Sequence, residues 1–214
     1  MEEEIQIINQ NTRREKFKNF IIKNKKILVT LVSSIIIIIL LLVFYSEIKF
    51  KNQIKLGNKY NKIVLSYEKT NNQNSEEELI DIIQKKDPTY SPLALNFIID
   101  NEIVNDKIKV NELFDIIIKK TNIENEIKNL IIYKKALYNS DNINENDLIN
   151  ILNPILNSES VWKSHSLYLL AEYFLSKNEK QKSKEFLVQI IELENANPKI
   201  KVEAQKRINR DLSD

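Results

Sequence analysis

The longest hydrophobic run of the chain extends from Ile27 to Tyr45 without a charged residue. Within its 19 residues only Thr30, Ser33, Ser34 and the terminal Tyr45 carry polar groups. An α-helix rises about 1.5 Å per residue, so a helix of this length covers the hydrocarbon core of a bilayer, which is about 30 Å thick. The pattern therefore predicts a single transmembrane helix over residues 27–45.

Beyond this run, apolar residues recur at the spacing of a helix. Tyr60, Ile63, Val64 and Tyr67 lie at positions i, i+3, i+4 and i+7, which places them on one helical face. Residues 46–68 contain no proline and a single glycine, so we expect this helix to continue directly from the span. The predicted divisions of the chain are a basic tail (1–26), the transmembrane helix (27–45), a membrane-proximal helix (46–69) and a helical domain (70–214).

Capping residues predict where the helices of this domain begin. Ser91 followed by Pro92 predicts a helix start, because serine caps helices and proline suits the first helical position. Thr121 or Asn122 is expected to cap a later helix. A loop is expected at 70–75, followed by a helix that Ser75 caps and that Glu76 to Glu78 open. A left-handed turn is expected at Asn178, between helices at 161–176 and 180–192. Asn197-Pro198 is expected to precede a last helix that runs towards Arg210.

The expected core faces of these helices are apolar stripes, and Pro154 is expected to bend or split the one that contains it. The stripes are Leu79, Ile80, Ile82 and Ile83; Leu95, Ile98 and Ile99; Leu113, Phe114, Ile117 and Ile118; Ile127, Leu130, Ile131 and Leu137; and Leu148, Ile151, Leu152, Ile155 and Leu156. Eight or nine helices of 10–20 residues in pairs predict an all-α fold, a degenerate tetratricopeptide-repeat (TPR)-like solenoid of helical hairpins. Because the full repeat signature is missing, an irregular helical bundle is the alternative.

Composition excludes several classes of protein for the part beyond the span. Its 169 residues carry 25 basic and 26 acidic side chains, and such a balance does not suit a nucleic-acid-binding face. The chain has no cysteine, so neither a disulfide nor a lipid-modified cysteine is expected. Its single glycine, Gly57, argues against tight hairpins and glycine-rich phosphate loops.

The charges that flank the span predict its orientation. Residues 1–26 carry seven basic side chains and residues 46–60 carry four, which favours a cytoplasmic N-terminus. A cleaved signal peptide is the competing interpretation, but the run is longer than usual and no small-x-small cleavage site follows Tyr45. We therefore expect a single-pass protein of the inner (cell) membrane, with its C-terminal domain in a periplasm-like space. The basic residues of the tail are expected to lie near anionic lipid head groups rather than to bind nucleic acid.

Several segments resemble a known family. Asn11 to Lys16 before the span, then Ser160 to Phe174 with its tryptophan, Asn178 and the helix after Pro198, resemble the ancillary SecYEG translocon subunit (YfgM) family. Asn178-Glu179 stands where that family usually has Gly-Asp. The resemblance covers most of the chain in layout and is specific around residues 160–205. It implies an inner-membrane protein whose periplasmic TPR-like domain associates with the Sec translocon and with periplasmic chaperones.

Residues that could carry chemistry are few. His165 is the only histidine, and the chain has no cysteine, so no second residue of these types could join it as a metal ligand. Ser164 and Ser166 beside it point to different sides of a helix. Glu76 to Glu78 suit a helix start, and the acidic residues near Asp141 lack the glycine and spacing of a calcium loop. We therefore assign no catalytic, cofactor or metal residue, expect no cofactor, and leave the partner-binding residues open.

Aromatic residues offer the other functional signal. Most should lie in the core, some could line a groove for a peptide, and Trp162 and Tyr133 are expected to be structural anchors. The leading hypothesis is a non-enzymatic, membrane-anchored adaptor that binds protein partners. A self-associating structural envelope protein, with oligomers built by the membrane-proximal helix, is the alternative. An envelope hydrolase is a third hypothesis, which the lack of candidate catalytic residues disfavours.

Overall fold

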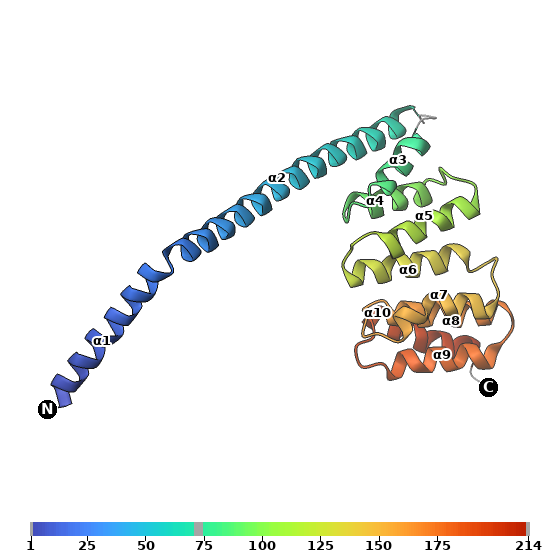
Figure 1. Cartoon of the computed structure of the whole chain (residues 1–214). Helices are drawn as coiled ribbons and strands as arrows, with labels where there is room; N and C mark the ends of the chain where they lie inside the picture. Colours follow the sequence, from blue (N-terminus) through green and yellow to red (C-terminus); the bar gives the residue numbers. More distant parts are fainter. Residues whose placement is uncertain (1, 71–74, 213–214) are drawn as a thin grey trace. The chain divides into compact units, whose positions relative to one another are not determined.

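The protein is entirely helical in the part that the structure describes. The computed structural model describes residues 2–70 and 75–212, which form ten α-helices and no strand (Figure 1). The expectation of an all-α protein is therefore confirmed. The chain divides into two compact units, Met1–Lys55 and Leu56–Asp214. The loop expected at 70–75 lies largely outside the described residues.

The first unit contains α1 (Glu2–Lys23) and most of the long helix α2 (Lys25–Thr70). As expected, the apolar run and the segment after it form one unbroken helix. The hydroxyls of Thr30 and Ser34 donate to backbone carbonyls of their own helix, at 2.9 and 2.8 Å, so these polar groups need no second helix. The large apolar side chains from Ile35 to Tyr45 are 48–68% exposed, and α2 is the one described helix long and apolar enough to cross a membrane.

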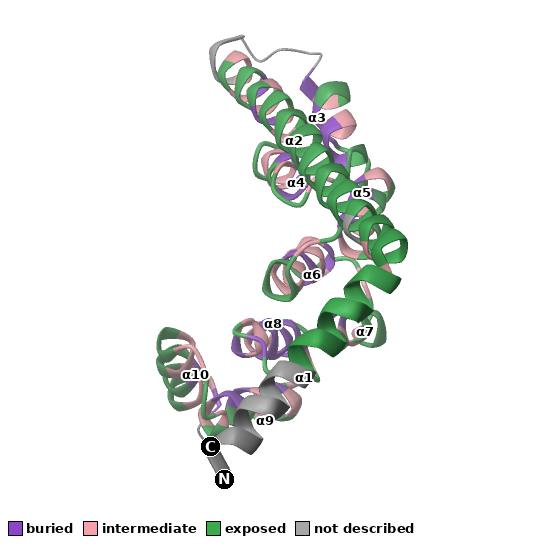
Figure 2. Ribbon diagram, turned by 60° about the vertical axis from the view of Figure 1, so that its left-hand side comes forward, coloured by how far each residue is buried: buried purple, intermediate pink, exposed green. Residues whose placement is uncertain are grey.

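The second unit is a stack of consecutive helices, each packed against the next along the chain. Helix α8 also packs against α6 and α10, and α3 packs against α5, so some contacts skip one helix along the chain (Figure 2). The bounds are α3 (Ser75–Gln84), α4 (Tyr90–Asp100), α5 (Lys107–Lys120), α6 (Asn125–Asn139), α7 (Glu145–Leu156), α8 (Lys163–Ser176), α9 (Lys180–Glu192) and α10 (Pro198–Asp211).

The core of this unit follows the stack as three successive apolar clusters rather than one centre. Ile63 near the end of α2 is buried in the first cluster, so the helix that carries the apolar run also contributes to the fold of the domain. The most buried members of the predicted stripes, such as Leu95, Phe114 and Leu152, are fully enclosed. Each cluster draws on several helices that follow one another in the chain, from α2 to α6 in the first cluster.

Two predicted caps are wrong. Helix α4 begins at Tyr90, where the Asp87 carboxylate accepts the amides of Thr89 and Tyr90 at 2.9 and 2.8 Å. The buried hydroxyl of Ser91 instead donates to the Ile82 carbonyl at 2.9 Å and accepts the Asp87 amide, which ties the end of α3 to the start of α4. A serine in the first turn can therefore serve a neighbouring helix instead of its own.

The cap predicted at Thr121 or Asn122, for the helix that is α6, is also wrong, and so is part of the core face predicted for that helix. Thr121 ends α5, and its hydroxyl donates to the Ile116 carbonyl at 3.1 Å. Helix α6 begins only at Asn125, preceded by Glu124. Ile131 is buried as predicted, but Ile127 and Leu137 are 39% and 50% exposed. Spacing alone predicts that the whole stripe is buried, but the neighbouring helices cover only its central part.

Further sequence predictions concern Asn178, Asn197, Pro154 and the first turn of α3. The Asn178 turn is confirmed, with φ of 62° between α8 and α9, and Asn197 caps α10 by accepting the amides of Lys199 and Ile200. Pro154 does not split α7, which continues to Leu156. Glu76 to Glu78 occupy the first turn of α3 as expected. Ser75, which was expected to cap this helix, is itself helical, and its buried hydroxyl has no partner among the described residues.

Candidate functional site

A groove of about 510 Å³ lies where α5, α6 and α7 meet. Helix α6 packs against both α5 and α7 (Figure 2). Apolar side chains form the floor of the groove, one or two from each helix and one from the loop before α7: Ile118, Ile132, Ile143, Ile151 and Pro154. Polar side chains line the rim, so the groove combines an apolar floor with hydrogen-bonding edges.

A small ionic network lies on the rim. The Asp115 carboxylate of α5 binds the Lys135 ammonium of α6 at 2.7 Å and the Lys119 ammonium one turn along α5 at 3.1 Å. Burial on its own would raise the pKa of Asp115, but the hydrogen bonds from Lys135 and Lys119 outweigh it and hold that pKa below its usual range. Asp115 is therefore a bound carboxylate at neutral pH, which suits a positioning role better than proton transfer.

Two asparagines join the helices that form the groove. Asn111 of α5 and Asn139 of α6 exchange amide hydrogen bonds in both directions, each 2.9 Å long. The amide of Asn139 also donates to the Lys135 carbonyl at 2.8 Å. On the opposite rim, Asn150 of α7 is exposed and lines the same groove. Asparagine offers a donor and an acceptor on one side chain, which is the pairing that a peptide backbone presents.

An aromatic cluster lies between α6 and the start of α8. The rings of Tyr133 and Trp162 stack with centroids 5.8 Å apart, and His165 contacts them at 6.0 and 5.1 Å. Both Tyr133 and Trp162 pack against the second core cluster, in line with the expectation that they are anchors. Burial raises the pKa of the Tyr133 hydroxyl.

The surroundings of His165 do not form a catalytic arrangement in the described part of the chain. Its Nδ1 atom is buried without a hydrogen-bond partner among those residues. The neighbouring Ser164 hydroxyl accepts the Asn197 amide at 3.2 Å, and the Ser166 hydroxyl is buried without a partner. Neither of these two hydroxyls is therefore held by the imidazole as an activated nucleophile would be. Nor does any group of three or more potential metal ligands occur within 2–70 and 75–212.

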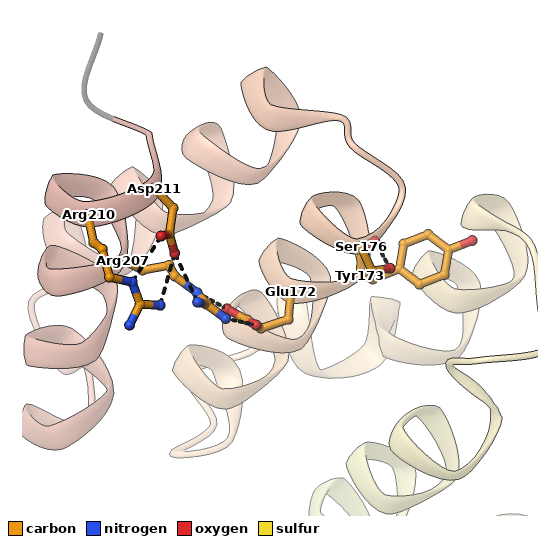
Figure 3. A network of polar contacts seen from close by, with 6 residues as sticks. All are labelled: Glu172, Tyr173, Ser176, Arg207, Arg210 and Asp211. Atoms are coloured by element: carbon orange, nitrogen blue, oxygen red, sulfur yellow. Dashed lines mark hydrogen bonds and ion pairs between the residues drawn. The ribbon is translucent and has the colours of Figure 1, made fainter.

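A network of ion pairs joins α10 to α8 (Figure 3). The Arg207 guanidinium binds both carboxylate oxygens of Glu172, with its Nε 2.7 Å from Oε1, and its third nitrogen reaches Asp211 at 2.9 Å. Hydrogen bonds from Arg210 and Arg207 lower the pKa of Asp211 to about 2. Each charge in the network faces an opposite one, so its role is to hold α10 in place.

Comparison of the chain with family models, with curated proteins and with solved structures finds no match.

Proposed function

We propose that this protein is a non-enzymatic, membrane-anchored adaptor whose helical domain binds a segment of a partner protein. The observation that carries the proposal is the groove between α5, α6 and α7, with its isoleucine floor and its asparagine and charged rim. An extended segment could place apolar side chains on the floor while the Asn150 amide bonds its backbone. The pairing of Asn111 with Asn139 keeps the groove walls in place before a partner arrives, which reduces the entropy lost on binding.

The domain fits a degenerate TPR-like solenoid. Support comes from the packing of each helix against the next along the chain, from the contacts of α8 with α6 and α10 and of α3 with α5, and from the succession of core clusters. A solenoid offers a long surface whose groove is set by small rotations between hairpins, and such surfaces serve protein binding far more often than catalysis.

The proposed anchor is the apolar part of α2. Nothing in the described part of the chain covers the side chains from Ile35 to Tyr45, and lipid would do so at a gain of roughly 25 cal/mol per Å² of apolar surface. The excess of basic residues before Ile27 favours a cytoplasmic N-terminus and hence a periplasmic domain, with the protein in the inner membrane. The family resemblance suggests the Sec translocon and a periplasmic chaperone as partners.

The test is photo-crosslinking in cells from two exposed positions of the full-length protein. A photoreactive residue at Asn150 reports the groove, and one at Val202 of α10, which is 53% exposed, reports an unrelated surface. We expect adducts from position 150 that contain a translocon subunit or an envelope chaperone, identified by mass spectrometry. The change Asn150→Arg should abolish binding in a detergent pull-down, whereas Val202→Arg should not. Equal adducts from both positions would contradict a groove-specific adaptor.

Self-association is a second candidate, because Ile48, Phe50 and Ile54 remain 45–60% exposed on α2 beyond the apolar run. Replacing Ile48 and Ile54 by serine should convert an oligomer to a monomer in detergent if these side chains pair two copies. Sedimentation of the full-length protein distinguishes the two states. A monomeric parent protein would refute this candidate and leave the adaptor proposal intact.

A further inference from the structure

The second half of α1 exposes an unusual mixture of side chains. Phe17, Phe20 and Ile22 are 56–66% exposed, and Ile21 is 41% exposed. None of them packs in the core clusters, all of which lie in the other unit. Aromatic and isoleucine side chains that stay uncovered over six residues favour an apolar environment supplied from outside the chain.

The same segment is strongly basic. Residues 13–23 carry one acidic side chain, Glu15, against Arg13, Arg14, Lys16, Lys18 and Lys23. None of the ion pairs among the described residues includes any of these cations. A ligand that covers the apolar side chains of this segment and also pairs with its basic side chains must carry negative charge beside an apolar surface.

The position of the segment identifies that ligand. Helix α1 ends at Lys23, and only Asn24 separates it from α2; the Asn24 side chain donates to the Phe20 carbonyl at 2.9 Å. Ile22 lies five helical steps, or about 7.5 Å, before Ile27, where the apolar run begins, and Phe20 lies seven steps, or about 10.5 Å, before it. If α2 crosses the bilayer, Ile22 therefore lies within about a head-group thickness of the hydrocarbon core and Phe20 a few ångströms beyond it.

We propose that residues 13–23 of α1 form a second membrane contact that binds the surface of an anionic lipid bilayer. Phe17 and Phe20 insert at the boundary of head groups and acyl chains, and Arg13, Arg14 and Lys16 bind lipid phosphates. Nucleic acid also attracts cations, but it does not cover four apolar side chains next to a span. The inference rests on the proposed membrane anchor, and its test reports the two separately.

The absence of native cysteine allows a unique label in the full-length protein. Ile21→Cys, carrying a polarity-sensitive dye, reports α1, and Ile37→Cys reports the span. Each protein is reconstituted into vesicles of phosphatidylcholine alone or with phosphatidylglycerol, and the emission maximum is measured. We expect the label at 37 to be blue-shifted in both lipids and the label at 21 to be blue-shifted only with phosphatidylglycerol, with a loss of that shift at high salt.

Matched variants separate charge from insertion. Arg13→Gln, Arg14→Gln and Lys16→Gln together should weaken the surface-bound state about 100-fold, or roughly fivefold (~1 kcal/mol) per charge. The triple change of Lys49, Lys51 and Lys55 to glutamine, on the other side of the span, should leave the label at 21 unchanged. Phe17→Ser with Phe20→Ser should abolish the blue shift at 21 while the label at 37 stays buried.

Three results would overturn the inference. The label at 21 could emit alike in both lipids, which would remove the role of anionic head groups. A short RNA could produce the same shift in phosphatidylcholine vesicles, which would assign the cations to nucleic acid. A label at 37 with the emission of water would refute the membrane anchor itself, and the second contact with it.

Discussion

Gly57 is the single glycine of the chain, and it lies where α2 crosses the side chain of Tyr90. A Cβ atom at this position would meet the Tyr90 Oη at 2.3 Å and its Cζ at 2.6 Å. Both distances are well below van der Waals contact. The ring is packed beside Tyr60, with centroids 6.1 Å apart, and borders the first core cluster, so it cannot swing away without losing contacts.

The change Gly57→Ala therefore has two opposing effects on the free energy of unfolding. Alanine stabilises a helix interior by about 1 kcal/mol relative to glycine. Forcing a methyl group into an occupied site costs about 1–3 kcal/mol. We expect a net destabilisation of about 1 kcal/mol, because the ring rather than a flexible chain end must move.

A double-mutant cycle isolates the contact. In a Tyr90→Leu background the ring is gone, so Gly57→Ala should stabilise by about 1 kcal/mol, which gives a coupling of about 2 kcal/mol between the two positions. Urea unfolding of the full-length protein in detergent, followed by helical circular dichroism, measures all four proteins. If Gly57→Ala has the same effect with and without the Tyr90 ring, the proposed close approach of α2 and α4 is refuted.

Three further outcomes are expected. Replacing Arg207 by methionine should lower stability by about 1–2 kcal/mol, because Glu172 loses a paired fork of hydrogen bonds; thermal unfolding checks this, and an unchanged midpoint would contradict it. The pKa of Asp211 is lowered from 3.8 to about 2, so its stabilising contribution is complete above pH 4 and is lost as the pH falls towards 2. Acid titration of Asp211→Asn should lack that part of the transition; identical acid curves would refute it. Changing Asn139 to alanine should cost about 1–2 kcal/mol, since Asn111 loses its partner, whereas changing both to alanine should add little more; additive losses would argue against the pairing.

Local features of the chain were predicted where a single helix decides the outcome. The uncharged run from Ile27 to Tyr45 is long enough to be recognised without knowledge of its neighbours, and it forms part of one helix as expected. The cap at Asn197 and the left-handed turn at Asn178 depend on backbone conformation and on side-chain bonds within a few residues. The residues that form such interactions lie within a few positions of one another, so a short stretch of sequence contains all of them.

Features that join two helices could not be predicted in this way. Ser91 was expected to cap its own helix, yet it bonds a carbonyl of α3 at position 82. The groove depends on Asn111 and Asn139, which are 28 positions apart, and nothing in this asparagine-rich sequence distinguishes them from the other asparagines. The reason why glycine occupies position 57 is visible only in the tertiary structure, where the Tyr90 ring lies against it.

The sequence by itself thus determined that the protein is helical, where its apolar helix lies and where several of its helices begin and end, because each of these follows from periodicity or from contacts a few residues apart. The tertiary structure alone decided which side chains meet across helices. It set the groove of α5, α6 and α7 and the Arg207 network that holds α10. The physical reason is that these contacts depend on how neighbouring helices are rotated and shifted against each other, and many arrangements are compatible with the same apolar stripes.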